Sequence, residues 1–250
     1  MKLLKAMAIA FSIYSKIPVP QFEWKEEDME YMMCFFPWIG LFFFGWAVLC
    51  EKFAVGNVCY ALIGAAIPLM ISGGFHVDGY MDTMDAFHSY QSREKKLEIL
   101  KDSHIGAFAA IMLALYYMID IAAISEIHTQ KAVSAVAAVF FLARCFSGIA
   151  VMTLQPAKKE GLLYTFASSA QKVMVKAALY FQTVLCVVLM LLVSGWYGAA
   201  AIGAVLLSFF YFKKKSYKEL GGITGDTAGF FVTVCEAAAA AAVAVTGYFL

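Results

Sequence analysis

The sequence predicts an all-α protein: a polytopic integral membrane helical bundle, with about six to seven transmembrane helices plus an N-terminal amphipathic helix. Composition is the first observation, because 62% of the 250 residues are apolar and only 15% are charged, whereas soluble domains carry about 25% charge. The second is that apolar runs long enough to cross the ~30 Å hydrocarbon core recur along the whole chain. Together they exclude a soluble globular protein.

The N-terminal segment, residues 1–30, begins with Lys2 and Lys5 before a short apolar stretch, without the small-residue cleavage site of a signal peptide. We expect a retained amphipathic helix at the membrane interface. No linker is long enough to separate a second domain, so residues 1–250 are expected to form one. The apolar runs predict spans at 34–53, 58–75, 105–125, 131–154, 174–193, 197–212 and 229–250, of which the sixth is short.

Basic residues are distributed unevenly between the two sides of this arrangement. Of the 19 lysines and arginines, all but Lys52, Lys131 and Arg144 fall on one side. By the positive-inside rule, the 76–104, 155–173 and 213–228 loops therefore face the cytoplasm. The net charge of +1 hides a basic face that suits anionic lipid heads or anionic substrates equally well. We expect membrane lipid as a partner and no nucleic acid.

The six cysteines exclude two further kinds of site. They lie in or at the edges of apolar runs and form no Cys-x-x-Cys pair. Neither zinc nor a disulfide framework is therefore indicated. We interpret them as small buried apolar residues.

The most informative motif is GGFHVDGYMDTMD, residues 73–85, directly after the second predicted span. Asp78, Asp82 and Asp85 are spaced i, i+4 and i+7, so on a helix they share one face within about 60° of arc. Three carboxylates on one face repel each other unless a cation lies between them, and ligands with oxygen alone favour Mg²⁺. The alternative is a solvated acidic face. The glycines of the motif favour the metal site, because they let backbone approach a ligand.

Two other polar patches lie on the same predicted side. In residues 93–106, Lys101 and Asp102 stand where the chain re-enters the bilayer, and we expect both to bind substrate. Residues 221–229, GGITGDTAG, form a glycine-rich loop before a helix, which exposes backbone N–H groups suited to phosphate. A plain turn is the alternative for this loop. The residues expected to act there are Gly222, Thr224, Gly225 and Asp226.

Two further side chains are candidates for substrate binding. Arg144 is interpreted as the one charge deep in a span, ten residues or about 15 Å before Leu154. It either meets a substrate phosphate or a carboxylate, or forms a structural pair between helices, and both roles stay open. His76 precedes the aspartates by two residues and is expected to hydrogen-bond substrate or to orient a ligand.

In this order and spacing, the motifs resemble those of the cobalamin synthase family, the adenosylcobinamide-GDP ribazoletransferases of bacterial vitamin B12 assembly. The resemblance runs nearly end to end. It rests on KIPVP at 16–20, FPWIG at 36–40, GGFHVDG at 73–79 with Asp82 and Asp85, KDSHIG at 101–106 and GGITGD at 221–226. Two segments depart from the family pattern: Ala86-Phe87, where many members look glycine-rich, and KKEGL at 158–162, where an arginine is common.

The resemblance implies a single integral-membrane catalytic domain in the bacterial inner membrane, with its active site facing the cytoplasm. The implied reaction is Mg²⁺-dependent and joins adenosylcobinamide-GDP to α-ribazole, or its 5′-phosphate, with release of GMP. Mg²⁺ on Asp78, Asp82 and Asp85 would hold the pyrophosphate. Asp85 or Asp226 would accept the hydroxyl proton. Lys101 and Arg144 would bind non-bridging oxygens.

Two other classes of protein share some of these features. A CDP-alcohol phosphotransferase-like or prenyltransferase-like enzyme also places aspartates around Mg²⁺ and a diphosphate, but the arginine expected after Asp-Gly-x-x-Ala is absent, since Asp82 follows Met81. A cation transporter predicts broken helices in repeated halves, and we find no clear internal repeat. A homo-oligomer, or docking of other cobalamin-assembly enzymes on the basic face, is left open.

Overall fold

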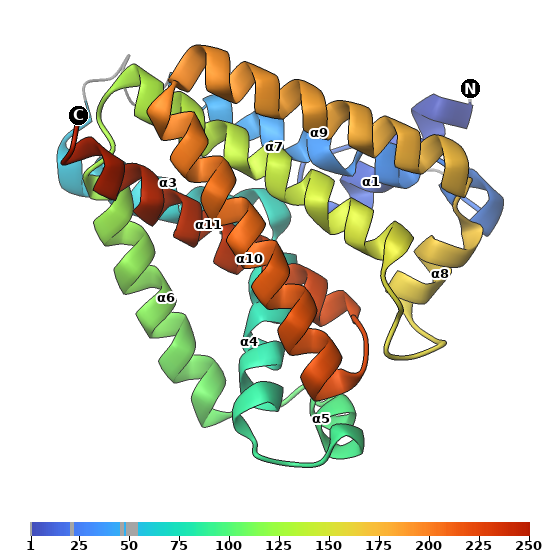
Figure 1. Cartoon of the computed structure of the whole chain (residues 1–250). Helices are drawn as coiled ribbons and strands as arrows, with labels where there is room; N and C mark the ends of the chain where they lie inside the picture. Colours follow the sequence, from blue (N-terminus) through green and yellow to red (C-terminus); the bar gives the residue numbers. More distant parts are fainter. Residues whose placement is uncertain (1, 21–22, 46–47, 49–54) are drawn as a thin grey trace.

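The structure, a computed structural model, describes residues 2–20, 23–45, 48 and 55–250. Regular structure in this part of the chain is helical, and the β pairing found there is an isolated bridge between Pro156 and Ile223. The all-α fold class is therefore confirmed. The long helices cross one another at several angles (Figure 1), so the bundle is not a set of parallel rods.

Five helices in the described residues are long and apolar enough to span a membrane. Their bounds are α6 Ala107–Ser125, α7 Gln130–Thr153, α9 Lys172–Ser194, α10 Trp196–Leu220 and α11 Gly225–Gly247. The most apolar stretch of α7 is 83% buried and that of α11 is 72% buried, against 22% for α9. Helices α7 and α11 thus form the core of the bundle, and α6, α9 and α10 present apolar faces outward.

A sharp bend separates helix α3, Asn57–Ser72, from helix α4, Phe75–His88. The two axes meet at 96°, and the linking residues Gly73 and Gly74 have φ angles of 65° and 89°. Two successive left-handed residues strongly favour glycine, because it has no Cβ to clash. If the bent pair counts as one span, the described residues contain six spans, which fits the predicted polytopic bundle.

The N-terminal helix α1, Lys2–Tyr14, buries Ala6, Ile9, Ala10 and Tyr14 on one face. It contacts the short helices η1 Glu26–Met29, η2 Met32–Cys34 and η3 Phe36–Leu41. The first predicted span, 34–53, lies partly outside the described residues; its described part forms a shorter apolar helix, Phe36–Gly45. The placement of α1 on the membrane surface stays a prediction.

The predicted loops turn out to be mostly helical. Residues 76–104 contain nearly all of α4 and the short helix α5, Arg93–Ile99. The sixth span was expected to end at residue 212, but α10 continues to Leu220. Its last turns are stabilised by Glu219, which accepts from Lys96 of α5 and pairs with Lys215 at 3.0 Å. The glycine-rich connection before α11 is therefore only residues 221–224.

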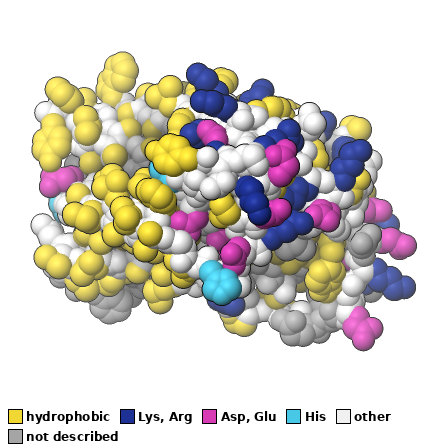
Figure 2. All heavy atoms as spheres, turned by 90° about the horizontal axis from the view of Figure 1, so that it is seen from below, with side chains coloured by type: hydrophobic (Ala, Val, Ile, Leu, Met, Phe, Trp, Pro, Cys, Tyr) yellow, Lys and Arg dark blue, Asp and Glu magenta, His cyan; other side chains and the backbone are white. Residues whose placement is uncertain are grey.

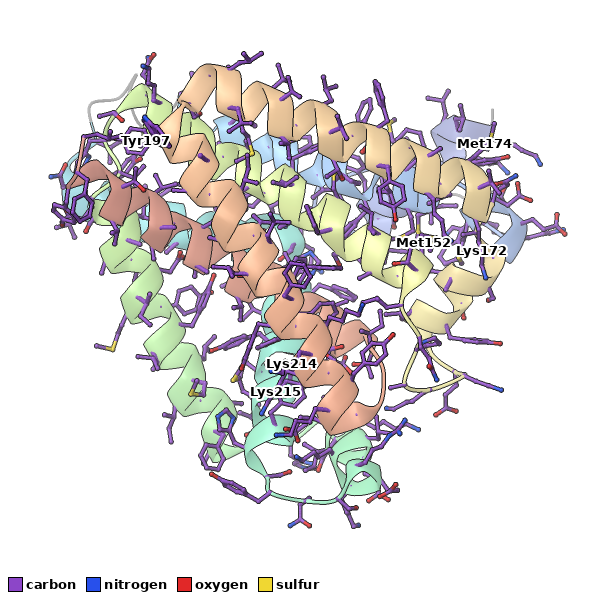
Figure 3. All side chains as sticks on the ribbon, in the orientation of Figure 1. Met152, Lys172, Met174, Tyr197, Lys214 and Lys215 are labelled. Carbon is purple, nitrogen blue, oxygen red and sulfur yellow. The ribbon has the colours of Figure 1, made fainter. Side chains whose placement is uncertain are left out.

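Charged side chains gather on one part of the face that Figure 2 shows. From below, they cover much of one half of the visible face, and hydrophobic side chains cover much of the other half (Figure 2). Figure 3 shows Lys172 at one end of α9 and Lys214 and Lys215 on the lower part of α10, far from Tyr197. These lysines belong to the basic side that the sequence predicts.

Candidate active site

Helix α4 crosses the first turns of α11 at two glycines. A Cβ on Gly79 would lie 2.7 Å from the carbonyl oxygen of Asp226, and one on Gly229 would lie 3.1 Å from that of His76. Because neither residue has a side chain, the two backbones approach closely. This crossing brings Asp226 beside the aspartate helix, although almost 150 residues separate it from Asp78 in the sequence.

A cavity of about 500 Å³ lies at this crossing, and we call it the reaction cavity. Its volume is in the range of small-molecule sites. Side chains from four separate parts of the chain meet there: the start of α4, the turn after α5, the segment before α8 Leu162–Ser169, and the start of α11. Its polar lining residues are Asp78, Lys101, Lys158, Glu160, Thr224 and Asp226.

Backbone pairing holds the segment around Lys158 in place. The amide of Ile223 donates to the carbonyl of Gln155 at 2.9 Å, and the amide of Ala157 donates to that of Ile223 at 2.8 Å. A Cβ on Gly222 would lie 2.6 Å from the Gln155 carbonyl oxygen, so glycine is required for this approach. The connection 221–224 and the segment 155–157 therefore form one unit beside the reaction cavity.

Lys158 is held over the reaction cavity by its own hydrogen bond. Its ammonium group donates to the carbonyl of Leu97 in α5 at 3.1 Å. Burial and the neighbouring Lys101 charge lower its pKa, while Asp226 and Glu160 act in the opposite direction. Lys101 pairs with Glu160 at 2.6 Å, and both side chains are largely exposed. Exchange of that carboxylate for another anion costs little, because exposed ion pairs are weak.

The first turn of α11 opens onto the reaction cavity. Thr224 is its N-cap: the Thr224 hydroxyl accepts from the amide of Thr227 at 3.2 Å, and the Thr227 hydroxyl accepts from the amide of Thr224 at 2.8 Å. The Thr224 hydroxyl also lies 3.3 Å from a carboxylate oxygen of Asp226. The N-terminal end of a helix attracts anions, and here it is flanked by Lys101 and Lys158.

The carboxylates of the aspartate helix and of α11 form one electrostatic cluster. Asp82 is close enough to Asp78, Asp85 and Asp226 to interact with each charge, and Asp226 interacts with Asp78 and Lys158. In the described residues, no three acidic, histidine or cysteine side chains lie close enough to hold a metal ion. Mg²⁺ commonly takes one or two carboxylates and completes its shell with water and phosphate oxygens. This all-oxygen set at a cavity lined by Asp78 and Asp226 fits that pattern.

Comparison with known families identifies the chain. A profile of the Cobalamin-5-phosphate synthase family matches residues 6–244. The chain belongs to this family. Similar proteins include an adenosylcobinamide-GDP ribazoletransferase of Lachnoclostridium phytofermentans, with 43% identity over 98% of this chain and 95% of the relative. A second, from Clostridium botulinum strain Eklund 17B, has 33% identity over 94% of each chain. No solved structure matches the chain.

In this member of the Cobalamin-5-phosphate synthase family, the structure brings five predicted site residues to one cavity. They are Asp78, Lys101, Thr224, Gly225 and Asp226. They come from three motifs that the sequence analysis placed on the same side of the membrane. Their meeting supports a single site, while the role of each residue stays a prediction.

Asp85 has a different local role from the one expected. Its two carboxylate oxygens accept from the backbone amides of Gly106 at 2.7 Å and Ala109 at 2.8 Å. Asp85 therefore caps the start of α6, where a negative charge also interacts favourably with the helix dipole. The structure places its carboxylate against α6, and we leave Asp85 out of the proposed ligand set.

Arg144 lies inside the bundle and forms a structural pair between helices, which is one of the two roles that the sequence left open. It is fully buried, and its Nη1 donates at 2.7 Å both to the Phe140 carbonyl and to Glu236 of α11. The assignment of Arg144 to a substrate phosphate is therefore not supported. Nor is it the one interior charge, because Glu236 and Asp120 are buried in α11 and α6. A search for a carboxylate in the other apolar spans would have found both, since a buried charge requires a partner.

Four other predicted residues are not among those that line the reaction cavity, and one of them, Asp82, belongs to the acidic cluster described above. His76 is buried among the rings of Tyr14, Phe36 and Phe75, and within the described chain neither ring nitrogen has a hydrogen-bond partner. Asp102 is exposed and accepts from His104. Gly222 packs against residues 155–157. Lys158 and Glu160 were missed because they fall where the chain departs from the family pattern.

Proposed function

We propose that this protein is an Mg²⁺-dependent transferase that joins adenosylcobinamide-GDP to α-ribazole, or to its 5′-phosphate, and releases GMP. The family membership and the names of its relatives support this reaction. The observation that carries the proposal is the reaction cavity, which gathers Asp78 and Asp226, two lysines and the start of α11. A pyrophosphate is typically bound by a metal cation on carboxylates, by ammonium groups and by the backbone amides at the start of a helix.

In the proposed reaction, the ribazole hydroxyl oxygen attacks the phosphorus that carries the cobinamide arm. The bond from that phosphorus to the GMP oxygen breaks, and the electron pair leaves with GMP, in line with the attack. Lys101 and Lys158 bind non-bridging phosphate oxygens. Asp226 accepts the hydroxyl proton. Mg²⁺ held by Asp78 and Asp82 would neutralise charge on the pyrophosphate.

The proposed location is the bacterial inner membrane, with the reaction cavity open to the cytoplasm. Five long apolar helices support a membrane protein. The basic loops support the orientation, because positive residues accumulate on the cytoplasmic side.

Purified protein in detergent, supplied with adenosylcobinamide-GDP and α-ribazole, tests the proposal. We expect release of GMP with Mg²⁺ and loss of that release in excess EDTA, restored by added Mg²⁺. A protein that is folded and monodisperse but releases no GMP with either α-ribazole or its 5′-phosphate would contradict the proposed reaction. Full activity in EDTA would contradict the metal requirement alone.

Asp226→Ala is expected to lower turnover by at least ~10²-fold, the usual scale for loss of general acid–base help. The apparent affinity for adenosylcobinamide-GDP is expected to change much less, because lysines and helix amides still bind the phosphates. Steady-state kinetics on folded protein measures both quantities.

Asp226→Asn is the matched control for this prediction. The amide keeps the size of the side chain and can still interact with Thr224, but it accepts no proton. We expect Asn to be as inactive as Ala. Near-normal turnover of Asp226→Asn would instead assign Asp226 to helix stabilisation at the start of α11, which is worth about 1 kcal/mol.

A further inference from the structure

A second cavity, of about 530 Å³, shares Asp78 with the reaction cavity. It is formed by the end of α1, the bend between α3 and α4, and α6, so we call it the hinge pocket. Asp78 and Phe75 line both the hinge pocket and the reaction cavity. Two cavities of similar size therefore share one carboxylate, as expected for a reaction that brings two substrates together at one point.

The cation of the hinge pocket is Lys16, from the KIPVP motif that the proposed reaction leaves without a role. Its backbone amide donates to the carbonyl of Ile71 at 2.7 Å, which ties the segment after α1 to the end of α3. A Cβ on Gly73 would collide with the methylene carbons of Lys16. The stem of Lys16 therefore lies across the glycine bend, and this contact fixes where its ammonium group is presented.

The other walls of the hinge pocket define the ligand. Leu69, Phe75 and Leu113 give an apolar surface, and Ser12 and Tyr117 add hydroxyl groups. A ligand that matches this lining has a planar apolar part, hydroxyls and one anionic group. A nucleoside monophosphate has all three, whereas a corrinoid is much larger than the space.

We propose that the hinge pocket binds the acceptor of the reaction as its 5′-phosphate, with Lys16 on the phosphate and the attacking hydroxyl turned toward Asp78. This inference rests on the proposed function, and the reaction cavity would hold the pyrophosphate of the other substrate. Lys16 then determines which form of the acceptor is preferred. The nucleoside without its phosphate has no group to meet Lys16 and binds through the apolar walls.

Steady-state kinetics of Lys16→Gln with two acceptors tests this assignment. For α-ribazole 5′-phosphate we expect the KM to rise at least ~10-fold, the scale of one charge-assisted hydrogen bond to phosphate. For α-ribazole we expect a much smaller change, so that the preference for the phosphorylated acceptor is lost. Lys16→Arg keeps the charge and should retain most of the preference. Lys172→Gln, at an exposed lysine at the start of α9 that lines neither cavity, controls for a general effect of charge.

Equal effects of Lys16→Gln on both acceptors would overturn the assignment. An anionic lipid headgroup is the other source of phosphate at a membrane interface, so the assays are repeated in nanodiscs with and without phosphatidylglycerol. If Lys16→Gln raises the KM only when phosphatidylglycerol is present, and by the same factor for both acceptors, Lys16 binds the lipid headgroup instead. A wild-type protein that is inactive with both acceptors would contradict the proposed function, and not this assignment alone.

A second variant keeps the test independent of Lys16. Ser12 is exposed on α1 and lines the hinge pocket, so Ser12→Phe fills part of the space. We expect a higher KM for both acceptors and little change in the KM for adenosylcobinamide-GDP. The reverse pattern, with only the corrinoid substrate affected, would place the corrinoid in the hinge pocket and overturn the proposal.

Discussion

Asp82→Asn is expected to abolish GMP release while the protein stays inserted and folded. Asp82 interacts with the charges of Asp78, Asp85 and Asp226, so it lies at the centre of the acidic cluster. Removal of one like charge relieves repulsion in the metal-free protein, and its thermal stability in EDTA should therefore be no lower than that of wild type. The loss of activity is then a loss of metal and phosphate binding, and not of folding.

The same variant has a readout that does not depend on activity. A ligand that binds only the folded state at 100 times its Kd stabilises it by about 2.7 kcal/mol. We expect Mg²⁺ to raise the thermal midpoint of wild type in detergent and to raise that of Asp82→Asn much less. Glu98→Gln, at an exposed carboxylate of α5, should keep both activity and the Mg²⁺ response. Near-normal turnover of Asp82→Asn at ordinary Mg²⁺ would contradict the metal assignment.

Replacement of either partner of the Arg144–Glu236 pair is expected to destabilise the bundle strongly. The two side chains are 0% and 5% exposed. Loss of one partner leaves a buried charge without its counter-charge, which costs about 3–5 kcal/mol in proteins. Arg144→Met and Glu236→Leu should each lower the thermal midpoint and the yield of monodisperse protein. Heating in detergent followed by size-exclusion chromatography measures the remaining folded fraction.

The double variant Arg144→Met/Glu236→Leu is the control. Substitution of both partners by apolar residues of similar size is often neutral, so we expect most of the lost stability to return. Recovery of GMP release together with stability would confirm a structural pair. A double variant that is stable but inactive would instead support a role for Arg144 in binding substrate, which the structure does not indicate. If the double variant is as unstable as the single variants, loss of the ion pair between α7 and α11 is not the main cause of their lower stability.

The helices could be predicted from the sequence because each depends mainly on its own apolar run. Helix α7, expected at 131–154, is observed at Gln130–Thr153, and α11, expected at 229–250, is observed at Gly225–Gly247. The largest difference is α10, whose last turns are too polar to be counted as a span. They remain helical because Glu219 pairs with lysines of α5 and α10. That stabilisation depends on a tertiary contact with α5, which cannot be predicted from the composition of the segment.

The site could be predicted in part, for a similar reason. The spacing of the aspartates and the basic side of the membrane predicted a single site. Asp78, Lys101 and Asp226 do line one cavity, while their roles stay predictions. Spacing says nothing about the neighbours of a side chain, so it did not predict that Asp85 would cap α6. Lys158 reaches the reaction cavity through backbone pairing between two irregular segments, and such pairing has no periodic pattern in the sequence.

The separation of Arg144 and Glu236 by 92 residues also affects how the chain is made. Ribosomes add roughly 5–20 residues per second, so α7 leaves the ribosome several seconds before the helix that neutralises it exists. A central arginine costs about 2.5–3.5 kcal/mol on insertion. During this interval the nascent chain depends on the translocon, lipids and water to tolerate the unpaired guanidinium. A chain that stops before α11 lacks Glu236, so its Arg144 never acquires this counter-ion.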